Sequence, residues 1–74
     1  MRNQHRRLVG LERRLRALRV ERNYTQAEAA KRIGVGSESL RKFEAGESTP
    51  TLCTLLWVCD AYKVTLLELL PEES

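Results

Sequence analysis

The chain of 74 residues is 42% hydrophobic and 31% charged, which fits one small globular domain and excludes a disordered chain. Two cysteines exclude a multi-disulfide scaffold, and no apolar run approaches the roughly 20 residues that cross a bilayer, so we expect a cytoplasmic protein with free thiols and no secretory leader. Residues 1–43 carry twelve Lys and Arg against four acids (+8), and residues 44–74 carry one Lys against six acids (−5), so the total of +3 conceals a basic half. Such a half is a candidate surface for nucleic acid, although a solvated basic face would have the same composition.

The first predicted helix ends near Asn23, a residue type that tolerates the left-handed conformation of a helix end, and Tyr24 then supplies an apolar contact. Four leucines at helical spacing share one face of this helix: Leu8, Leu11, Leu15 and Leu18. Gly10 interrupts this leucine pattern, so we expect the segment before Gly10 to fray or turn.

A second, short helix is predicted to begin after Thr25, because Thr25 and Glu28 have the spacing of a capping box. Residues 33–36 (Ile-Gly-Val-Gly) are typical of a tight turn that ends it. A third helix is expected over Ser37–Glu44, with two residues facing the core: Leu40 and Phe43.

A fourth helix is predicted to begin after Thr51 and to close at Lys63, and a fifth to run from Leu66 to Leu70 between the Thr65 cap and Pro71. No segment alternates with the period of two that favours a strand. The residues expected to share the inward face of the fourth helix are Leu52, Leu55, Leu56, Cys59 and Tyr62.

Residues 25–44 combine two short helices with a glycine-containing turn, which is the pattern of a helix-turn-helix. Ala29 or Ala30 is small enough for close approach of the two helices, and Gly34 suits the turn. The apolar residues that would anchor both helices are Ile33, Val35, Leu40 and Phe43.

With five helices in this order and the helix-turn-helix at residues 25–44, the chain resembles the Cro/phage-repressor type of helix-turn-helix regulator, also called the xenobiotic-response-element type. The resemblance implies an all-α, five-helix, lambda-repressor-like domain over residues 11–70, with a basic arm or helix extension at 1–10 and an acidic tail at 71–74. It implies a repressor that binds a palindromic operator as a homodimer, without a cofactor. The matching stretches are Leu15-Arg16-Ala17-Leu18-Arg19, Tyr24-Thr25-Gln26-Ala27-Glu28, Ile33-Gly34-Val35, Leu40-Arg41-Lys42-Phe43-Glu44-Ala45-Gly46, Pro50-Thr51-Leu52 and Val64-Thr65-Leu66-Leu67-Glu68-Leu69-Leu70.

The resemblance also implies roles for single residues. Thr25 and Gln26, at the start of the second helix, would face a DNA phosphate, and Gln26 would brace the third helix. Ser39 is expected on the phosphate side of that helix. The residues implied to point into the major groove are Ser37, Glu38, Arg41 and Lys42.

Three positions depart from the family pattern. Gly36 stands where a Ser or Thr usually caps the third helix. Glu38 would repel phosphate, and Glu47 and Ser48 occupy a loop where basic residues are common, although backbone amides there could reach phosphate.

Each of these residues also has a plainer interpretation. Gln26 could be an ordinary surface residue, Arg41 and Lys42 solvated charges, and Glu38 the partner of one of them at helical spacing. Arg19 and Glu44 resemble a partly buried structural pair of the family, and deleting either partner is expected to destabilise the fold.

The N-terminal arm is basic and could follow the phosphate backbone or enter the minor groove, or could be a solvated end. Its basic residues are Arg2, His5, Arg6 and Arg7.

Trp57 is expected to face away from the core beside Cys53, which indicates a contact surface; the alternative is a core contact under the C-terminal tail. Together with Leu67 and Leu70 these residues are candidates for a dimer or partner-protein contact. A protein-interaction module, such as an antitoxin-type adaptor on the same fold, is therefore the second hypothesis for function. A single His and two cysteines six residues apart assemble no catalytic set and no metal site, so we do not expect an enzyme.

Overall fold

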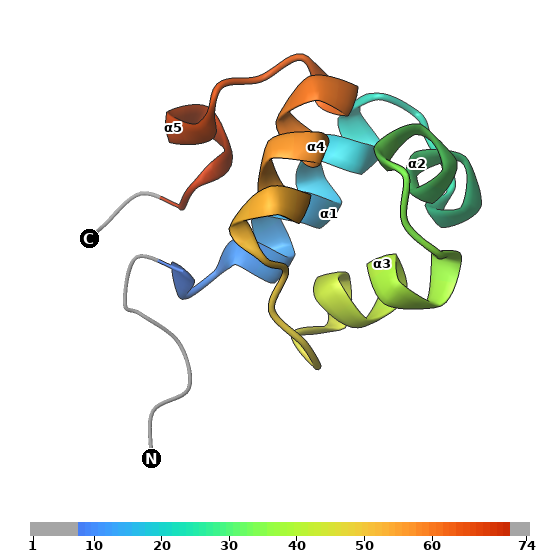
Figure 1. The fold of residues 1–74 in the computed structure, drawn as a ribbon, viewed down its shortest axis with the longest axis horizontal. Coiled ribbons are helices and arrows are strands. Elements are labelled where there is room, and N and C mark those ends of the chain that lie inside the picture. The colour runs from blue at the N-terminus through green and yellow to red at the C-terminus, as the bar shows by residue number, and fades with distance from the viewer. Residues whose placement is uncertain (1–7, 72–74) are drawn as a thin grey trace.

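The computed structural model describes residues 8–71, and within them it contains five α-helices and no strand (Figure 1). The all-α class and the order of elements predicted from the sequence are confirmed. The arm residues Arg6 and Arg7 and the tail residues 72–74 lie outside the described residues. The helices are α1 (Leu11–Glu21), α2 (Gln26–Ile33), α3 (Ser37–Ala45), α4 (Leu52–Tyr62) and α5 (Leu66–Leu69).

The helices enclose one hydrophobic core. α1 packs against α3 and α5, whereas α2 packs against α3 and α4, so α2 and α3 form one side of the molecule and α5 covers the other (Figure 1). Burying these side chains supplies the main favourable free energy of folding. The buried hydrophobic residues are Leu11, Leu15, Leu18, Ala29, Ala30, Ile33, Leu40, Leu55, Val58, Cys59, Tyr62 and Leu69.

Both ends of α1 form as the sequence indicates. Gly10 has a φ of 93°, a conformation that L side chains rarely adopt, and the helix starts directly after it. Leu8 lies in the preceding turn and packs against the core from there. At the other end Asn23 has a φ of 60°, and the Tyr24 amide donates to the Arg19 carbonyl at 3.3 Å.

Side-chain caps define the starts of α4 and α5. The Thr51 hydroxyl accepts a hydrogen bond from the Thr54 amide at 3.1 Å, and Thr65 forms a reciprocal capping box with Glu68. The hydrogen bond from the Thr65 amide holds the pKa of Glu68 below its ordinary value. Lys63 closes α4 in the left-handed conformation, with a φ of 60°.

The expected inward face of α4 is partly wrong. Leu55, Cys59 and Tyr62 are buried as predicted, and Val58 joins them. Leu52 and Leu56, by contrast, are 61% and 47% exposed. α4 carries apolar residues on most of its circumference, so helical spacing alone admits more than one inward face, and packing against α2 and α5 decides between them.

Candidate nucleic-acid interface

The helix-turn-helix expected over residues 25–44 is present as α2, a turn and α3. The Thr25 hydroxyl accepts from the Glu28 amide at 3.1 Å, and the Glu28 carboxylate accepts from the Thr25 amide at 2.8 Å. This backbone hydrogen bond lowers the pKa of Glu28. Gly34 has a φ of 100° and donates its amide to the Ala30 carbonyl at 2.8 Å, so the turn needs its glycine. Buried alanines let α2 pack closely against α3.

α3 is held to the core through one side only. Leu40 is its buried residue, with Phe43 half-buried, whereas Ser37, Glu38 and Lys42 are exposed. Gly36 precedes the helix and offers no side-chain cap, as its residue type predicted. The side of α3 opposite Leu40 is therefore a polar surface available to a large partner.

Gln26 joins the start of α2 to the end of α3. Its side-chain amide donates a hydrogen bond to Oε1 of Glu44 at 3.1 Å. The bracing role that the resemblance implied for Gln26 thus has a physical basis, since this bond fixes one helix relative to the other. Thr25, directly before it, is exposed.

Glu44 also receives the predicted contact from α1. Nε of Arg19 donates to Oε2 of Glu44 at 2.8 Å, and Nη1 of Arg19 donates to the Tyr24 carbonyl at 2.8 Å. The two side chains are 12% and 3% exposed, so this is a nearly buried ion pair. Glu44 accordingly ties three helices together beneath the polar surface of α3.

Arg41 is engaged within the molecule. Its Nε and Nη2 donate to the two carboxylate oxygens of Glu38 at 2.9 and 2.8 Å, and Nη1 and Nη2 donate to Glu47 at 3.4 and 3.2 Å. We call these three residues the Arg41 cluster. The hydrogen bonds from Arg41 lower the pKa of Glu38, and the two carboxylates raise the pKa of Arg41.

The sequence left two partners open for Glu38, Arg41 and Lys42, three and four residues further along the helix, and the structure pairs Glu38 with Arg41. The sequence did not point to Glu47 as a partner of Arg41. Glu47 follows the left-handed Gly46 that ends α3, and that turn brings the side chain back along the helix. The sequence signal that could have predicted the Arg41–Glu47 contact is a glycine at the helix end followed by an acidic residue.

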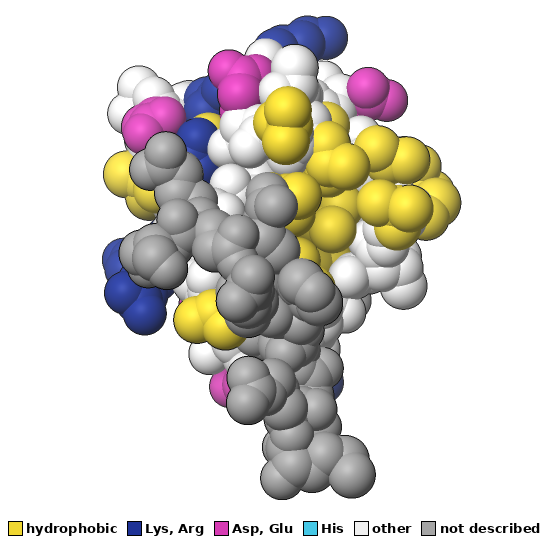
Figure 2. Space-filling view, turned by 90° about the vertical axis from the view of Figure 1, so that its left-hand side faces the viewer, with side chains coloured by type: hydrophobic (Ala, Val, Ile, Leu, Met, Phe, Trp, Pro, Cys, Tyr) yellow, Lys and Arg dark blue, Asp and Glu magenta, His cyan; other side chains and the backbone are white. Residues whose placement is uncertain are grey.

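A second surface lies on α4 and α5, away from α3. Trp57 is 46% exposed and Leu67 79% exposed, Cys53 is also exposed, and Leu70 is half-buried. Trp57 therefore faces outward as expected; the alternative, a contact under the C-terminal tail, involves residues 72–74, which lie outside the described part of the chain. Figure 2 shows hydrophobic side chains gathered over one area of this side of the molecule. Trp57 lines a hollow together with Arg32 and Ile33 of α2, whereas Leu67 and Leu70 line a pocket beside α1. We call Cys53, Trp57, Leu67 and Leu70 together the α4–α5 surface.

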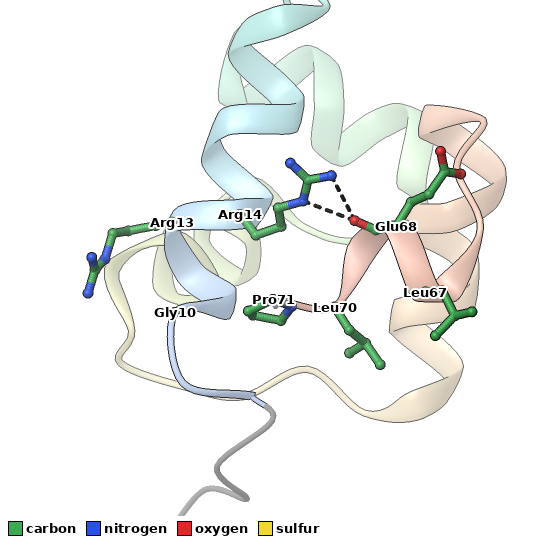
Figure 3. Close-up of a pocket in the computed structure, with 7 residues that line it drawn as sticks. All are labelled: Gly10, Arg13, Arg14, Leu67, Glu68, Leu70 and Pro71. Atoms are coloured by element: carbon green, nitrogen blue, oxygen red, sulfur yellow. Dashed lines mark hydrogen bonds between the residues drawn. The ribbon is translucent and has the colours of Figure 1, made fainter. Parts of the chain in front are cut away.

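A pocket of about 600 Å³ lies between α1 and α5 (Figure 3). Arg14 crosses it, with Nε and Nη2 donating to the Glu68 carbonyl at 3.0 and 2.7 Å, whereas Arg13 points away from it. Because the Arg14 guanidinium satisfies the Glu68 carbonyl near the end of α5, it joins α5 to α1 and stabilises the fold. The lining residues are Gly10, Arg13, Arg14, Leu67, Glu68, Leu70 and Pro71.

Within residues 8–71, no three His, Cys, Asp or Glu side chains lie together as a metal site would require. None of the helices in this range is long and apolar enough to cross a membrane.

Two packed helices at a glycine turn, with an exposed polar second helix, define a helix-turn-helix protein. The family model described as Helix-turn-helix matches residues 15–69, and the chain belongs to this family. This bears out the resemblance to phage repressors, because two curated relatives carry that description.

Both relatives are cryptic phage CTXphi transcriptional repressors, RstR. One, from Vibrio cholerae serotype O1, is 40% identical over 47 residues, which are 64% of this chain and 42% of the relative. The other, from Vibrio cholerae, is 37% identical over 60 residues, 81% of this chain and 54% of the relative. The chain thus spans about half the length of these relatives.

A solved structure shows the same fold. It is the crystal structure of an HTH_3 family transcriptional regulator from Vibrio cholerae, with a TM-score of 0.76 and 27% identity. The match covers 80% of this chain and 33% of the other.

Proposed function

We propose that the chain is a cytoplasmic, non-enzymatic transcriptional repressor that binds double-stranded DNA with α3 in the major groove. One observation carries the proposal: α3 is anchored through Leu40, and its opposite side presents an exposed polar row next to the start of α2. An α-helix presented in this way fits the major groove of B-DNA. The repressor descriptions of the two curated relatives support the same function.

The side chains of α3 have chemistry suited to base edges. Lys42 can donate to O6 and N7 of guanine, Glu38 can accept from N4 of cytosine, and Ser37 can do either. In the proposal three further residues contact phosphates and thereby position the domain on the duplex. These are Thr25, Gln26 and Ser39; the arm residues Arg6 and Arg7, outside the described part of the chain, are proposed to add phosphate contacts.

A selection of bound sites from random duplex DNA, followed by fluorescence anisotropy on the selected site, tests this function. Lys42→Ala is expected to cost about 1–3 kcal/mol of binding free energy, roughly 5- to 150-fold in affinity, and to relax preference at one base pair. Gln26→Ala is expected to weaken binding to all sequences alike. Lys31→Ala is the matched control, because Lys31 is exposed in the last turn of α2, at the end opposite Gln26. Unchanged binding by both Lys42→Ala and Gln26→Ala would refute this interface.

We propose further that two copies join through the α4–α5 surface. Large exposed apolar side chains such as Trp57 and Leu67 favour an interface at this place. A two-fold dimer would select an inverted repeat with half-sites about one helical turn, roughly 34–36 Å, apart. Sedimentation is expected to show a dimer in the wild type and a monomer in Leu67→Lys. A monomeric wild type that selects a single half-site would refute the dimer and leave the surface to a partner protein, the second candidate function.

A further inference from the structure

The Arg41 cluster changes the charge that α3 presents. A free Arg41 would offer one positive charge and five N–H donors to a duplex. In the cluster every nitrogen of the guanidinium already donates to a carboxylate oxygen of Glu38 or Glu47. One guanidinium between two carboxylates leaves a net charge of −1 at this point of the proposed interface.

The ion pairs of the Arg41 cluster can also break and re-form. All three side chains are substantially exposed, and exposed ion pairs contribute little to stability because water and salt screen them. The contacts from Glu38 are shorter than those from Glu47, so the two carboxylates hold Arg41 unequally. A duplex can therefore displace the carboxylates, but only if it offers Arg41 and the released carboxylate better partners than they now have.

We propose that Glu47 is a specificity-determining residue, which acts through Arg41 by withholding its guanidinium from the phosphates of random DNA. The proposal rests on the DNA-binding function proposed above. Glu47 is a positioning residue in this scheme, since it acts on the duplex through the side chain that it holds.

The base that Glu38 contacts decides whether Arg41 is released from the cluster. The Glu38 carboxylate can accept from the N4 amino group of a cytosine or the N6 amino group of an adenine, whereas guanine O6 and N7 or thymine O4 present only acceptors that repel it. When such an amino group binds Glu38, Arg41 retains only the two longer contacts, 3.2 and 3.4 Å, to Glu47. The guanidinium then becomes available to a guanine or a phosphate, so Arg41 contributes on the matching sequence and is withheld elsewhere.

The direct test is Glu47→Gln, which keeps the shape of the side chain and removes its charge. Binding to a random-sequence duplex of about two helical turns is measured by fluorescence anisotropy over a range of salt concentrations. We expect affinity to rise roughly three- to tenfold, and the slope of log K against log salt to steepen by about 0.9, the value of one added phosphate contact. Asp60→Asn is the matched control, because Asp60 is exposed in the last turn of α4, and that end of the helix lies away from α3 (Figure 1).

A double-mutant cycle separates positioning from simple repulsion. If Glu47 acts through Arg41, the gain from Glu47→Gln disappears in the Arg41→Gln background. If Glu47 merely repels phosphate, the gain persists in that background, and the inference is overturned. It is also overturned if Glu47→Gln binds random DNA no better than Asp60→Asn.

The outcomes distinguish a failure of the role proposed for Glu47 from a failure of the DNA-binding function on which it rests. Wild-type binding that Lys42→Ala weakens but Glu47→Gln leaves unchanged removes the role of Glu47 and keeps the DNA-binding interface. Absence of salt-dependent duplex binding by wild type and all variants removes both.

Discussion

Arg19→Met tests the nearly buried ion pair that joins α1 to α3. The substitution keeps most of the side-chain volume but removes two hydrogen bonds, one to Glu44 and one to the Tyr24 carbonyl. It leaves the Glu44 carboxylate, 3% exposed, with the hydrogen bond from the Gln26 side-chain amide in place of the two side-chain donors that it had. The cost is therefore dominated by an uncompensated buried charge rather than by lost packing.

The expected loss of unfolding free energy is about 3 kcal/mol, near the lower end of the range for breaking a buried pair, because Gln26 still donates to Glu44. For a domain of this size that corresponds to a fall in Tm of roughly 12–24 °C. Thermal and urea denaturation, followed by far-ultraviolet circular dichroism, measure both quantities.

The double variant Arg19→Met/Glu44→Leu is the matched control. Removing both charges leaves no stranded carboxylate, so most of the lost stability is expected to return. If the single variant melts with the wild type, the pair contributes nothing and the reasoning is wrong. If the double variant is as unstable as the single, the loss comes from packing instead of charge.

Three further predictions concern two glycines of the α2–α3 turn and the buried phenol of Tyr62. Gly36→Ser supplies the missing cap of α3. Because Gly36 has an ordinary φ of −74° and an added Cβ meets only Ser39 Oγ at 4.0 Å, urea denaturation should show a gain in unfolding free energy of a few tenths of a kcal/mol. Gly34→Ala should instead lose about 1–2 kcal/mol, since its φ of 100° is strained for alanine although nothing lies within 4 Å; equal effects of the two substitutions would contradict the geometry. Burial raises the pKa of Tyr62 to about 12 from an ordinary 10, so the folded state holds this proton more tightly and stability should fall as pH rises from about 10 to about 12. Tyr62→Phe should remove that component of the pH dependence, and an unchanged profile would refute it.

Local signals predicted the helices well because each acts over a few residues. The capping box at Thr25, the cap at Thr65 and the left-handed Asn23 lie where their residue types indicated, and α4 closes at Lys63 as expected. The Arg19–Glu44 pair was also predicted, but from the family resemblance, since 25 residues separate the partners and no spacing rule joins them.

The inward face of α4 could not be read in the same way. Leu52 and Leu56 have the correct spacing for the core and are exposed, because a helix that is apolar on most sides takes its orientation from its neighbours. Part of the candidate site could likewise not be predicted from residue spacing. The polar residues of α3 were predicted, whereas the partnership of Arg41 with Glu47 depends on the turn at Gly46.

For this protein, residue order alone established the approximate helix boundaries and the helix-turn-helix class, because caps, turns and apolar spacing are short-range effects. Packing in three dimensions decided which side of α4 is buried, how Glu44 links α1, α2 and α3, and which charges surround Arg41. These are long-range matters, since burial and ion pairing depend on the distance between side chains in space, whatever their separation along the chain.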